Sequence, residues 1–556
     1  MAFVVLLYLG RALTFFGDEW EFITKRQDLT LQNLLGPHSQ HWSLFPVLVY
    51  KSLVSVVGLH SYLPYLAMLL LVHMTAVAGL FVLLRRMAGP LVALGGATLM
   101  LFLGSAYEDL FWAFQVGFVG SVAAGLWALV IVQASIDRRA LAAIGGLLFV
   151  AVASSGLGLF FLVAVGTLAL FDPSRRRVLQ PVVAVGIVYL VWFLIFGRTG
   201  LDAVHDPFSL AAMAGIPSFV ISGGGRGIGG LLGVNLPQNQ ALFVLLVASV
   251  AWRVIRGHHL PSLAVAAVAG LVVQFVIIGM ARDQLDAVGY AAVAPRYVYS
   301  SAAFLLLALA AFLGEPAKRS VSWRQGLAVA LVVGFALIGN LTSLHSGSLW
   351  FQRQAVQLRA AIAWLEEHPG SPLIRLNVPP TSYTPVGVSD ILALASRQGS
   401  VTRDDLLPGV VPRISSATTD QALFGLVKAA FQIRPAGDPV VDPTPPRMTA
   451  IHNLTAAPDG GCLSLRATGP VPQLSVAAPA GGSLLFVPEA NGSLKAYLSL
   501  LAEPQDADSI SVDVTGGQRF AIAIPDVGAD VPWTLSLVPP VEPMGGQLCS
   551  LSSPGP

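Results

Sequence analysis

The sequence has 556 residues, of which 55% are hydrophobic and only 11% are charged, and its 32 Lys and Arg nearly balance its 30 Asp and Glu. A soluble domain carries about 25% charged residues, so this composition excludes an ordinary soluble protein and predicts an integral membrane protein. The small net charge of +2 creates no field that would attract nucleic acid, and the sequence contains no nucleic-acid-binding motif.

The first apolar run extends from Phe3 to Phe16 and is interrupted only by Arg11. As a helix it would measure roughly 21 Å, against about 30 Å of hydrocarbon in a bilayer. Either the helix takes length from its flanks, or the true start of the chain lies upstream. A cleaved signal peptide is not expected, because no basic region precedes the run.

Ten further apolar runs have the length and composition of membrane helices, which predicts a polytopic α-helical bundle of about eleven spans. They lie at about 62–84, 91–105, 114–134, 140–155, 157–171, 178–196, 241–256, 260–280, 297–314 and 325–343.

The basic residues between these runs predict the orientation of the bundle. Pairs or triplets of Lys and Arg occur in alternate gaps, at 85–86, 138–139, 175–177, 253–256 and 318–324. Because cytoplasmic loops are enriched in Lys and Arg, we expect these loops and the N-terminus in the cytoplasm of a cell whose plasma membrane holds the protein. The acidic loops and the tail after Leu344 are then extracytoplasmic.

Two segments of the predicted outer loops are apolar but do not look like spans. The segment from Trp42 to Lys51 is broken by Pro46, so we expect an interfacial helix, and Phe208 to Ile221 is similar. The stretch Gly223 to Gly230 formally contains G-x-G-x-x-G, but no strand precedes it. It predicts a flexible loop near a lipid phosphate and no dinucleotide site.

The tail is expected to hold two regions after the membrane domain of residues 1–344. Residues 345–447 should form an extracytoplasmic amphipathic helix and a mixed α/β segment; the part from about 371 cannot be assigned in detail. The helix should end at Pro369, because its apolar residues recur at helical spacing until then. These residues are Phe351, Ala355, Leu358, Ile362 and Leu365.

Residues 448–556 are expected to form a β-sandwich. Apolar residues alternate with polar ones in runs such as 510–514, 520–524 and 533–537, each bounded by Gly, Pro or Asp. The only two cysteines, Cys462 and Cys549, lie near the first and last strands of this region. They can form a disulfide if this end of the chain faces an oxidising compartment.

The acidic pair Asp18-Glu19 follows the first apolar run directly. A carboxylate at the centre of a membrane helix costs on the order of 2.5–3.5 kcal/mol, so the pair belongs at the water boundary. It could simply mark the end of a span. However, a second pair, Glu108-Asp109, and Arg296 also lie at predicted outer ends of spans, and together these residues resemble an active site.

Sugar transfer at the outer membrane face would use such residues. A carboxylate can deprotonate an acceptor hydroxyl for attack on an anomeric carbon, and the departing phosphate of a lipid-linked donor needs positive charge. Arg296 is the first candidate, because guanidinium binds phosphate through two hydrogen bonds, and Arg282 or Arg226 could assist. The alternative for Arg296 is an interfacial side chain that reaches toward water.

Residues that could bind the sugar or acceptor occur in two outer loops. The spacing of His38 and His41 places both rings on one face if the segment is helical, and together with Glu108 or Asp109 they could hold a divalent metal such as Mg²⁺ or Mn²⁺. Histidines that only hydrogen-bond within the loop are the alternative. Aromatic and amide groups suited to sugar contacts flank these residues, at Trp42, Trp112 and Gln115; membrane-interface aromatics explain the same pattern.

With these residues, the chain resembles the GT-C superfamily of polytopic glycosyltransferases, which includes protein O-mannosyltransferases, lipid A aminoarabinose transferases and mycobacterial arabinofuranosyltransferases. The matching features are Asp18-Glu19 after the first span, a long first outer loop, about eleven spans and an extracytoplasmic C-terminal domain. The resemblance implies that Asp18 is the catalytic base with Glu19 beside it. It also implies a polyprenyl-phosphate sugar donor, a cell-envelope glycan, lipid or protein acceptor, and a carbohydrate-binding role for the β-rich tail.

Two other functions fit the same features. A non-enzymatic transporter or assembly factor for lipid-linked glycans would place ionisable residues near the bilayer midplane, whereas here the acidic residues gather at outer ends of spans. A glycan polymerase or ligase with a pyrophosphate-linked donor would need several outer arginines, and Arg198, Arg226, Arg282 and Arg296 could supply them.

Overall fold

The computed structural model describes residues 1–26, 28–134, 136–200, 210–257, 260–282, 290–312, 323–407, 409, 413–501, 509–528, 532–539 and 545–552. These residues form two compact units. The first unit comprises Met1–Phe15, Lys25–Gly58 and Tyr62–Gln352, and the second comprises Phe16–Thr24, Leu59–Ser61 and Arg353–Pro556.

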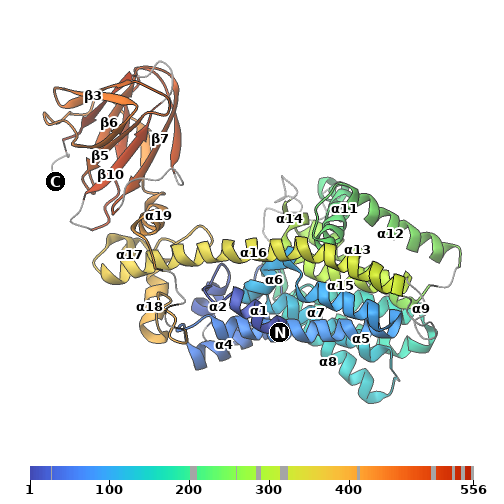
Figure 1. Ribbon diagram of the computed structural model, residues 1–556. Coiled ribbons are helices and arrows are strands. Elements are labelled where there is room, and N and C mark those ends of the chain that lie inside the picture. Colours follow the sequence, from blue (N-terminus) through green and yellow to red (C-terminus); the bar gives the residue numbers. More distant parts are fainter. Residues whose placement is uncertain are drawn as a thin grey trace. The chain divides into compact units, whose positions relative to one another are not determined.

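The first unit is built from helices (Figure 1), and many of them are apolar. Its α-helices are α1 (Ala2–Leu9), α3 (Leu31–Leu35), α4 (Leu44–Val57), α5 (Leu63–Leu101), α6 (Tyr107–Phe111), α7 (Val116–Val132), α8 (Arg138–Ser154), α9 (Gly158–Phe171), α10 (Leu179–Ile195), α11 (Leu210–Leu232), α12 (Gln238–Ile255), α13 (Ser262–Arg282), α14 (Tyr290–Val293), α15 (Pro295–Phe312) and the first part of α16 (Trp323–Glu367). Short 3₁₀ turns are η1 (Gly104–Ala106), η2 (Ala113–Gln115), η3 (Pro173–Val178) and η4 (Gly197–Gly200).

Six helical stretches in the described part of the chain are long and apolar enough to cross a membrane, and three shorter apolar helices accompany them. The six are Leu63–Phe111, Ala113–Val132, Pro173–Ile195, Gln238–Ile255, Ser262–Ala281 and Trp323–Glu367. The chain is therefore a multi-pass membrane protein with a helical membrane domain and a C-terminal β domain, as its composition predicts.

Helix α5 contains two of the predicted spans. At Gly89 the backbone leaves the helical region, with φ 84° and ψ 175°, and Pro90 begins the second arm. The side chain of Leu84 lies against Gly96, where an added Cβ would be 2.6 Å from Leu84 Cδ1. His73 Nε2 lies 3.4 Å from the carbonyl oxygen of Leu101. Such distant residues meet only if the chain reverses at Gly89, a φ that glycine adopts without strain.

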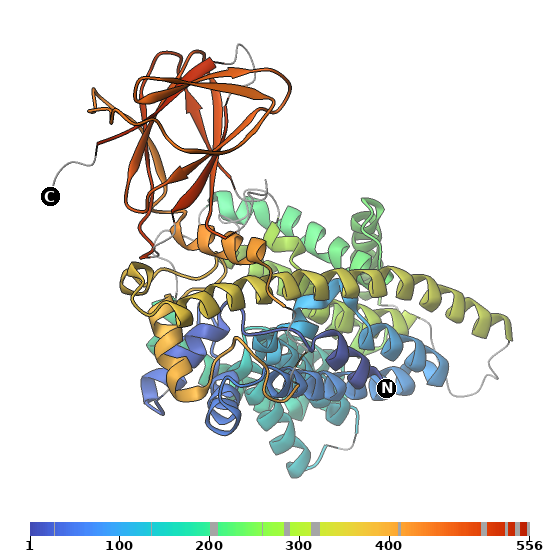
Figure 2. The same cartoon turned by 60° about the vertical axis from the view of Figure 1, so that its left-hand side comes forward.

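The glycine-rich stretch from Gly223 to Gly230 is helical and belongs to α11 (Figure 2). The prediction of a flexible loop was wrong. A Cβ on Gly224 would be 2.5 Å from the ring of Phe243 in α12, and one on Gly227 would be 2.9 Å from Ser301 in α15. Small residues let membrane helices approach closely, so the glycines here allow packing where flexibility was expected.

Helix α16 joins two elements that were predicted to be separate. The expected last span and the expected amphipathic helix form one helix of 45 residues that ends at Glu367, two residues before Pro369. The five apolar residues predicted to share a face, from Phe351 to Leu365, are all buried. The amphipathic pattern was therefore correct, but the helix continues without interruption from the preceding span.

The second unit contains short helices and the β domain. Its helices are α2 (Glu19–Lys25) as far as Thr24, α17 (Pro372–Leu376), α18 (Val388–Gln398) and α19 (Ser416–Val427), with the end of α16. Its strands are β1 (Gln432–Pro435), β2 (Met448–His452), β3 (Leu454–Asp459), β4 (Cys462–Ala467), β5 (Gln473–Ala478), β6 (Ser483–Pro488), β7 (Gly492–Ser499), β8 (Ile510–Val514), β9 (Phe520–Ala523), β10 (Trp533–Val538) and β11 (Gly545–Ser550).

The strands form two antiparallel sheets, and the runs of alternating residues predicted at 510–514, 520–524 and 533–537 correspond to β8, β9 and β10. One sheet has the order β1-β9-β6-β11-β4-β3 and the other β2-β5-β10-β7-β8. Strand β1 lies in the segment that the sequence left unassigned and pairs with β9.

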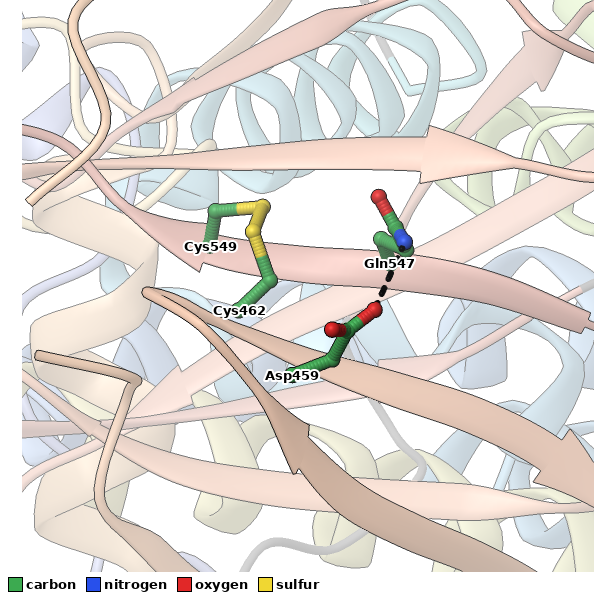
Figure 3. Close-up of a disulfide and its surroundings, with 4 residues drawn as sticks. All are labelled: Asp459, Cys462, Gln547 and Cys549. Atoms are coloured by element: carbon green, nitrogen blue, oxygen red, sulfur yellow. Dashed lines mark hydrogen bonds between the residues drawn. A yellow bond between two sulfur atoms is a disulfide. The ribbon is translucent and has the colours of Figure 1, made fainter. Parts of the chain in front are cut away.

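The two cysteines are bonded to each other across neighbouring strands. Cys462 in β4 and Cys549 in β11 are directly opposite in the register of the sheet and form a disulfide. Figure 3 shows the bond beside Gln547, whose side-chain amide donates to Asp459 Oδ2 over 3.5 Å. The bond thus links the last strand of the domain to one of its earliest.

Candidate active site

The turn that carries Glu108 and Asp109 lies between α5 and α7 and is fixed by helix α16. The buried side chain of Asn340 in α16 accepts from the backbone N–H of Ser105 over 3.0 Å. The same side chain donates to the carbonyl of Gly230 in α11 over 3.1 Å. One buried amide therefore joins three parts of the first unit and holds the acidic turn in place.

Glu108 pairs with Arg296 from the start of α15. Arg296 Nη1 lies 3.2 Å from Glu108 Oε2, and the two side chains are 22% and 10% exposed. The guanidinium also lies over the ring of Tyr297, 5.5 Å from its centroid. Two residues that the sequence placed at separate span ends are thus in direct contact, and Glu108 orients the guanidinium.

Asp109 is fully buried in the same unit. Among the described residues, neither of its carboxylate oxygens has a hydrogen-bond partner. Burying an unsatisfied carboxylate is costly, so the position of Asp109 lowers the stability of the folded protein.

His38 and His41 lie in a tight hairpin. Each donates its backbone N–H to the other's carbonyl over 2.9 Å, and Ser39 at the turn has a φ of 52°. The helical geometry that was predicted to place both rings on one face, as metal ligands, is therefore absent. His38 contacts Phe114 and His41 contacts Phe118, with ring centroids 5.2 and 5.8 Å apart.

The aromatic and amide residues predicted to contact sugar are mostly buried. Trp42 stacks on Trp192 of α10 with centroids 5.2 Å apart, and it donates to the carbonyl of Leu34. Trp112 stacks on Phe114, and Gln115 is 1% exposed. Trp42 in particular packs against Trp192 and holds the loop in place.

A pocket of about 450 Å³, which we call the apolar pocket, opens beside the hairpin. Most of its lining comes from α9, α10, α13 and α15, and the hairpin contributes Gln40 and His41. The lining residues are Gln40, His41, Gly156, Leu157, Leu159, Phe160, Gly186, Tyr189, Leu190, Phe193, Ile277, Ile278, Ala281 and Tyr297. Because Tyr297 also packs under Arg296, the pocket has a cation next to its wall.

Asp18 and Glu19 belong to the second unit. Glu19 is fully buried, and its Oε2 accepts the backbone N–H of Phe16 over 2.6 Å, which satisfies a main-chain donor ahead of α2. Asp18 is partly exposed. Within the pair, Asp18 is thus the carboxylate that solvent can reach, and Glu19 shapes the turn.

The remaining predicted cations differ in how far they are described. Arg226 projects from α11, and its Nε donates to the carbonyl of Val293 over 3.3 Å. Arg282 is the last residue of α13, and its side chain lies outside the described part of the chain. Across the described ranges, no three His, Cys, Asp or Glu side chains are grouped as metal ligands.

Comparisons with solved structures found several similar chains, two of which are described here. No family model matches the chain, and no curated protein matches it. The first structure is apo ArnT from Cupriavidus metallidurans, at 15% identity and TM-score 0.42, covering 68% of this chain and 79% of that one. The second is ArnT from the same organism bound to undecaprenyl phosphate, at 14% identity and TM-score 0.43, covering 65% and 79%.

The β domain offers little aromatic surface to a glycan. Its four aromatic residues, Phe486, Tyr497, Phe520 and Trp533, are all buried. Carbohydrate binding by ring stacking needs an exposed aromatic face, so the predicted carbohydrate-binding role would have to use polar groups.

Sequence reasoning missed three residues that shape this region. Tyr297 links the apolar pocket to Arg296, Trp192 anchors the first outer loop, and Asn340 holds the acidic turn. Asn340 gave a usable signal, because an amide inside a predicted span is costly unless it is hydrogen-bonded. Tyr297 and Trp192 look like ordinary apolar helix residues and gave none.

Proposed function

We propose that this protein is a membrane glycosyltransferase of the GT-C type, which transfers a sugar from a polyprenyl-phosphate donor. The observation that carries the proposal is the apolar pocket with Arg296 next to its wall. Apolar pockets with a few polar groups suit amphiphilic ligands, and a guanidinium is the side chain best suited to a phosphate. A lipid phosphate needs both.

In the proposed reaction, Asp18 takes the proton from an acceptor hydroxyl, and the oxygen attacks the anomeric carbon of the donor sugar. The bond between that carbon and the phosphate oxygen breaks, and polyprenyl phosphate leaves with the electron pair. Arg296, held by Glu108, stabilises the negative charge on the leaving phosphate. The product is the glycosylated acceptor.

We place the reaction on the extracytoplasmic face of the plasma membrane, with a cell-envelope glycan, lipid or protein as acceptor. The pattern of basic loops supports this side. The disulfide between Cys462 and Cys549 supports it independently, because disulfides persist in oxidising compartments.

The test is transfer of radiolabelled sugar from polyprenyl-phosphate donors to cell-envelope extracts by the purified protein in nanodiscs. Asp18→Asn should reduce transfer by at least about 10³-fold, because the general base is lost, while the protein still assembles. Glu19→Gln should mainly lower thermal stability. Full activity in Asp18→Asn would assign the base to another carboxylate, and transfer only from pyrophosphate-linked donors would replace the donor class.

A further inference from the structure

A second pocket lies close to the first and has the opposite character. We call it the polar pocket; its volume is about 420 Å³, within the range of about 300–1,000 Å³ typical of ligand sites. Its described lining contains the adjacent cations Lys25 and Arg26, the amides of Gln32 and Asn33, and the hydroxyl residues Ser39 and Thr199. This lining includes neither a carboxylate nor an aromatic ring.

The polar pocket is held in shape by Arg26. Its Nη1 donates to the carbonyls of Asn33 and Gly36, over 3.2 and 3.1 Å, and its Nη2 donates to the carbonyl of Pro37 over 2.7 Å. Arg26 therefore fixes the loop after α3 and adds positive charge to the pocket wall. The exposed Lys25 lines the same pocket from the end of α2.

The hairpin of residues 38–41 lies between the two pockets. Ser39 lines the polar pocket, whereas the next two residues, Gln40 and His41, line the apolar pocket. One tight turn thus borders a site for an apolar chain on one side and a site for a hydrophilic, negatively charged group on the other.

We propose that the polar pocket binds an acceptor saccharide that carries an oxyanion, a phosphate or a carboxylate, and that Lys25 recognises this group. The inference rests on the proposed function, which needs an acceptor site beside the donor site. The donor's own phosphate is the less suitable occupant, because the lipid chain attached to it needs apolar walls, which the other pocket supplies.

The test is calorimetric titration of the full-length protein in nanodiscs with three probes: glucose 6-phosphate, glucuronate and uncharged glucose. We expect both anions to bind at least about tenfold more tightly than glucose, since charge-assisted hydrogen bonds are the stronger ones. Lys25→Gln should weaken binding of the anions about tenfold, and Lys25→Arg should retain it. Lys51→Gln is the matched control, because it removes a lysine charge from α4, outside both pockets.

Two results would overturn the proposal: equal binding of glucose and glucose 6-phosphate, or unchanged binding of the anions in Lys25→Gln. A third would be competitive displacement of glucose 6-phosphate by geranyl phosphate, which would make the pocket a donor-phosphate site. These outcomes are separate from failure of the proposed function. Lys25-dependent binding in a protein without transferase activity would uphold the pocket and reject the enzyme, and activity without such binding would do the reverse.

Discussion

At the scale of single residues, the ion pair between Glu108 and Arg296 is the clearest feature of the candidate site. Each residue could be singled out from the sequence, because only 11% of the residues in this chain are charged. Their pairing could not, since they are 188 positions apart and only the packing of α15 against the acidic turn brings them together. The same holds for the burial of Glu19 and the exposure of Asp18, which depend on a local turn.

The ion pair predicts a measurable coupling. Arg296→Gln should lower the free energy of unfolding by about 1–3 kcal/mol, because it leaves the carboxylate of Glu108 partly buried and unpaired. The double variant Glu108→Gln with Arg296→Gln should lose less than the sum of the two single variants. Thermal unfolding in nanodiscs, analysed as a double-mutant cycle, measures this difference. Additive losses would show that the two side chains do not interact.

At the scale of elements, the positions of most helices and strands follow from the sequence, but the helical conformation of residues 223–230 does not. Runs of apolar residues predict α7 to α10 well, and alternation predicts β8 to β10. The stretch from Gly223 to Gly230 was misread because glycine lowers helix propensity by about 1 kcal/mol per residue relative to alanine. Packing against Phe243 and Ser301 compensates for this cost, and a single sequence does not reveal it.

The close packing of Gly224 in α11 and the open surroundings of Gly334 in α16 predict opposite effects for two glycine substitutions. Gly224→Ala should destabilise the protein by about 1–3 kcal/mol, because the new methyl group would overlap the ring of Phe243. Gly334→Ala in α16 is the matched control, since a Cβ there meets no atom within 4 Å, and it should be neutral or stabilising by up to about 1 kcal/mol. The melting temperatures of the two purified variants measure these effects. A Gly224→Ala variant more stable than the unaltered protein would refute the close packing of α11.

The loop before α4 depends on the stacked pair Trp42 and Trp192. Trp192 Nε1 donates to the carbonyl of Leu35 over 2.7 Å, so Trp192→Phe loses this bond but keeps an aromatic ring, and Trp192→Leu loses both. We expect limited proteolysis within residues 26–43 to accelerate slightly in the first variant and by about tenfold in the second. Equal rates in all three proteins would show that the stack does not anchor the loop.

At the scale of the whole molecule, composition was sufficient to predict a multi-pass membrane protein, and the alternation of apolar residues after residue 448 was sufficient to predict a β-rich tail. The charge pattern also gave an orientation, which stays a prediction. What could not be foreseen is which outer-loop residues share a pocket, because the two pockets combine side chains from the first loop with residues of α10, α13 and η4. Contacts between such distant segments have no periodic signal in one sequence.

The disulfide predicts both the location and the stability of the β domain. In intact membranes, Cys462 and Cys549 should resist a maleimide reagent until a reductant is added. Cys549→Ser should lower the stability of the domain by about 4–5 kcal/mol on the chain-entropy model, because the bond closes a loop between residues 87 positions apart. Gel-shift labelling and thermal unfolding measure the two effects. Labelling without reductant would place the tail in a reducing compartment.

The hairpin of residues 38–41 limits which sequence changes this protein can accept during evolution. Ser39 lines the polar pocket, whereas Gln40 and His41 line the apolar pocket. Replacing one of these residues therefore alters only the pocket that it lines. Inserting or deleting a residue would move neighbouring side chains from one pocket to the other, much as a slipped strand exchanges its two faces. We therefore expect homologues to vary in the identity of these four residues but to preserve their number.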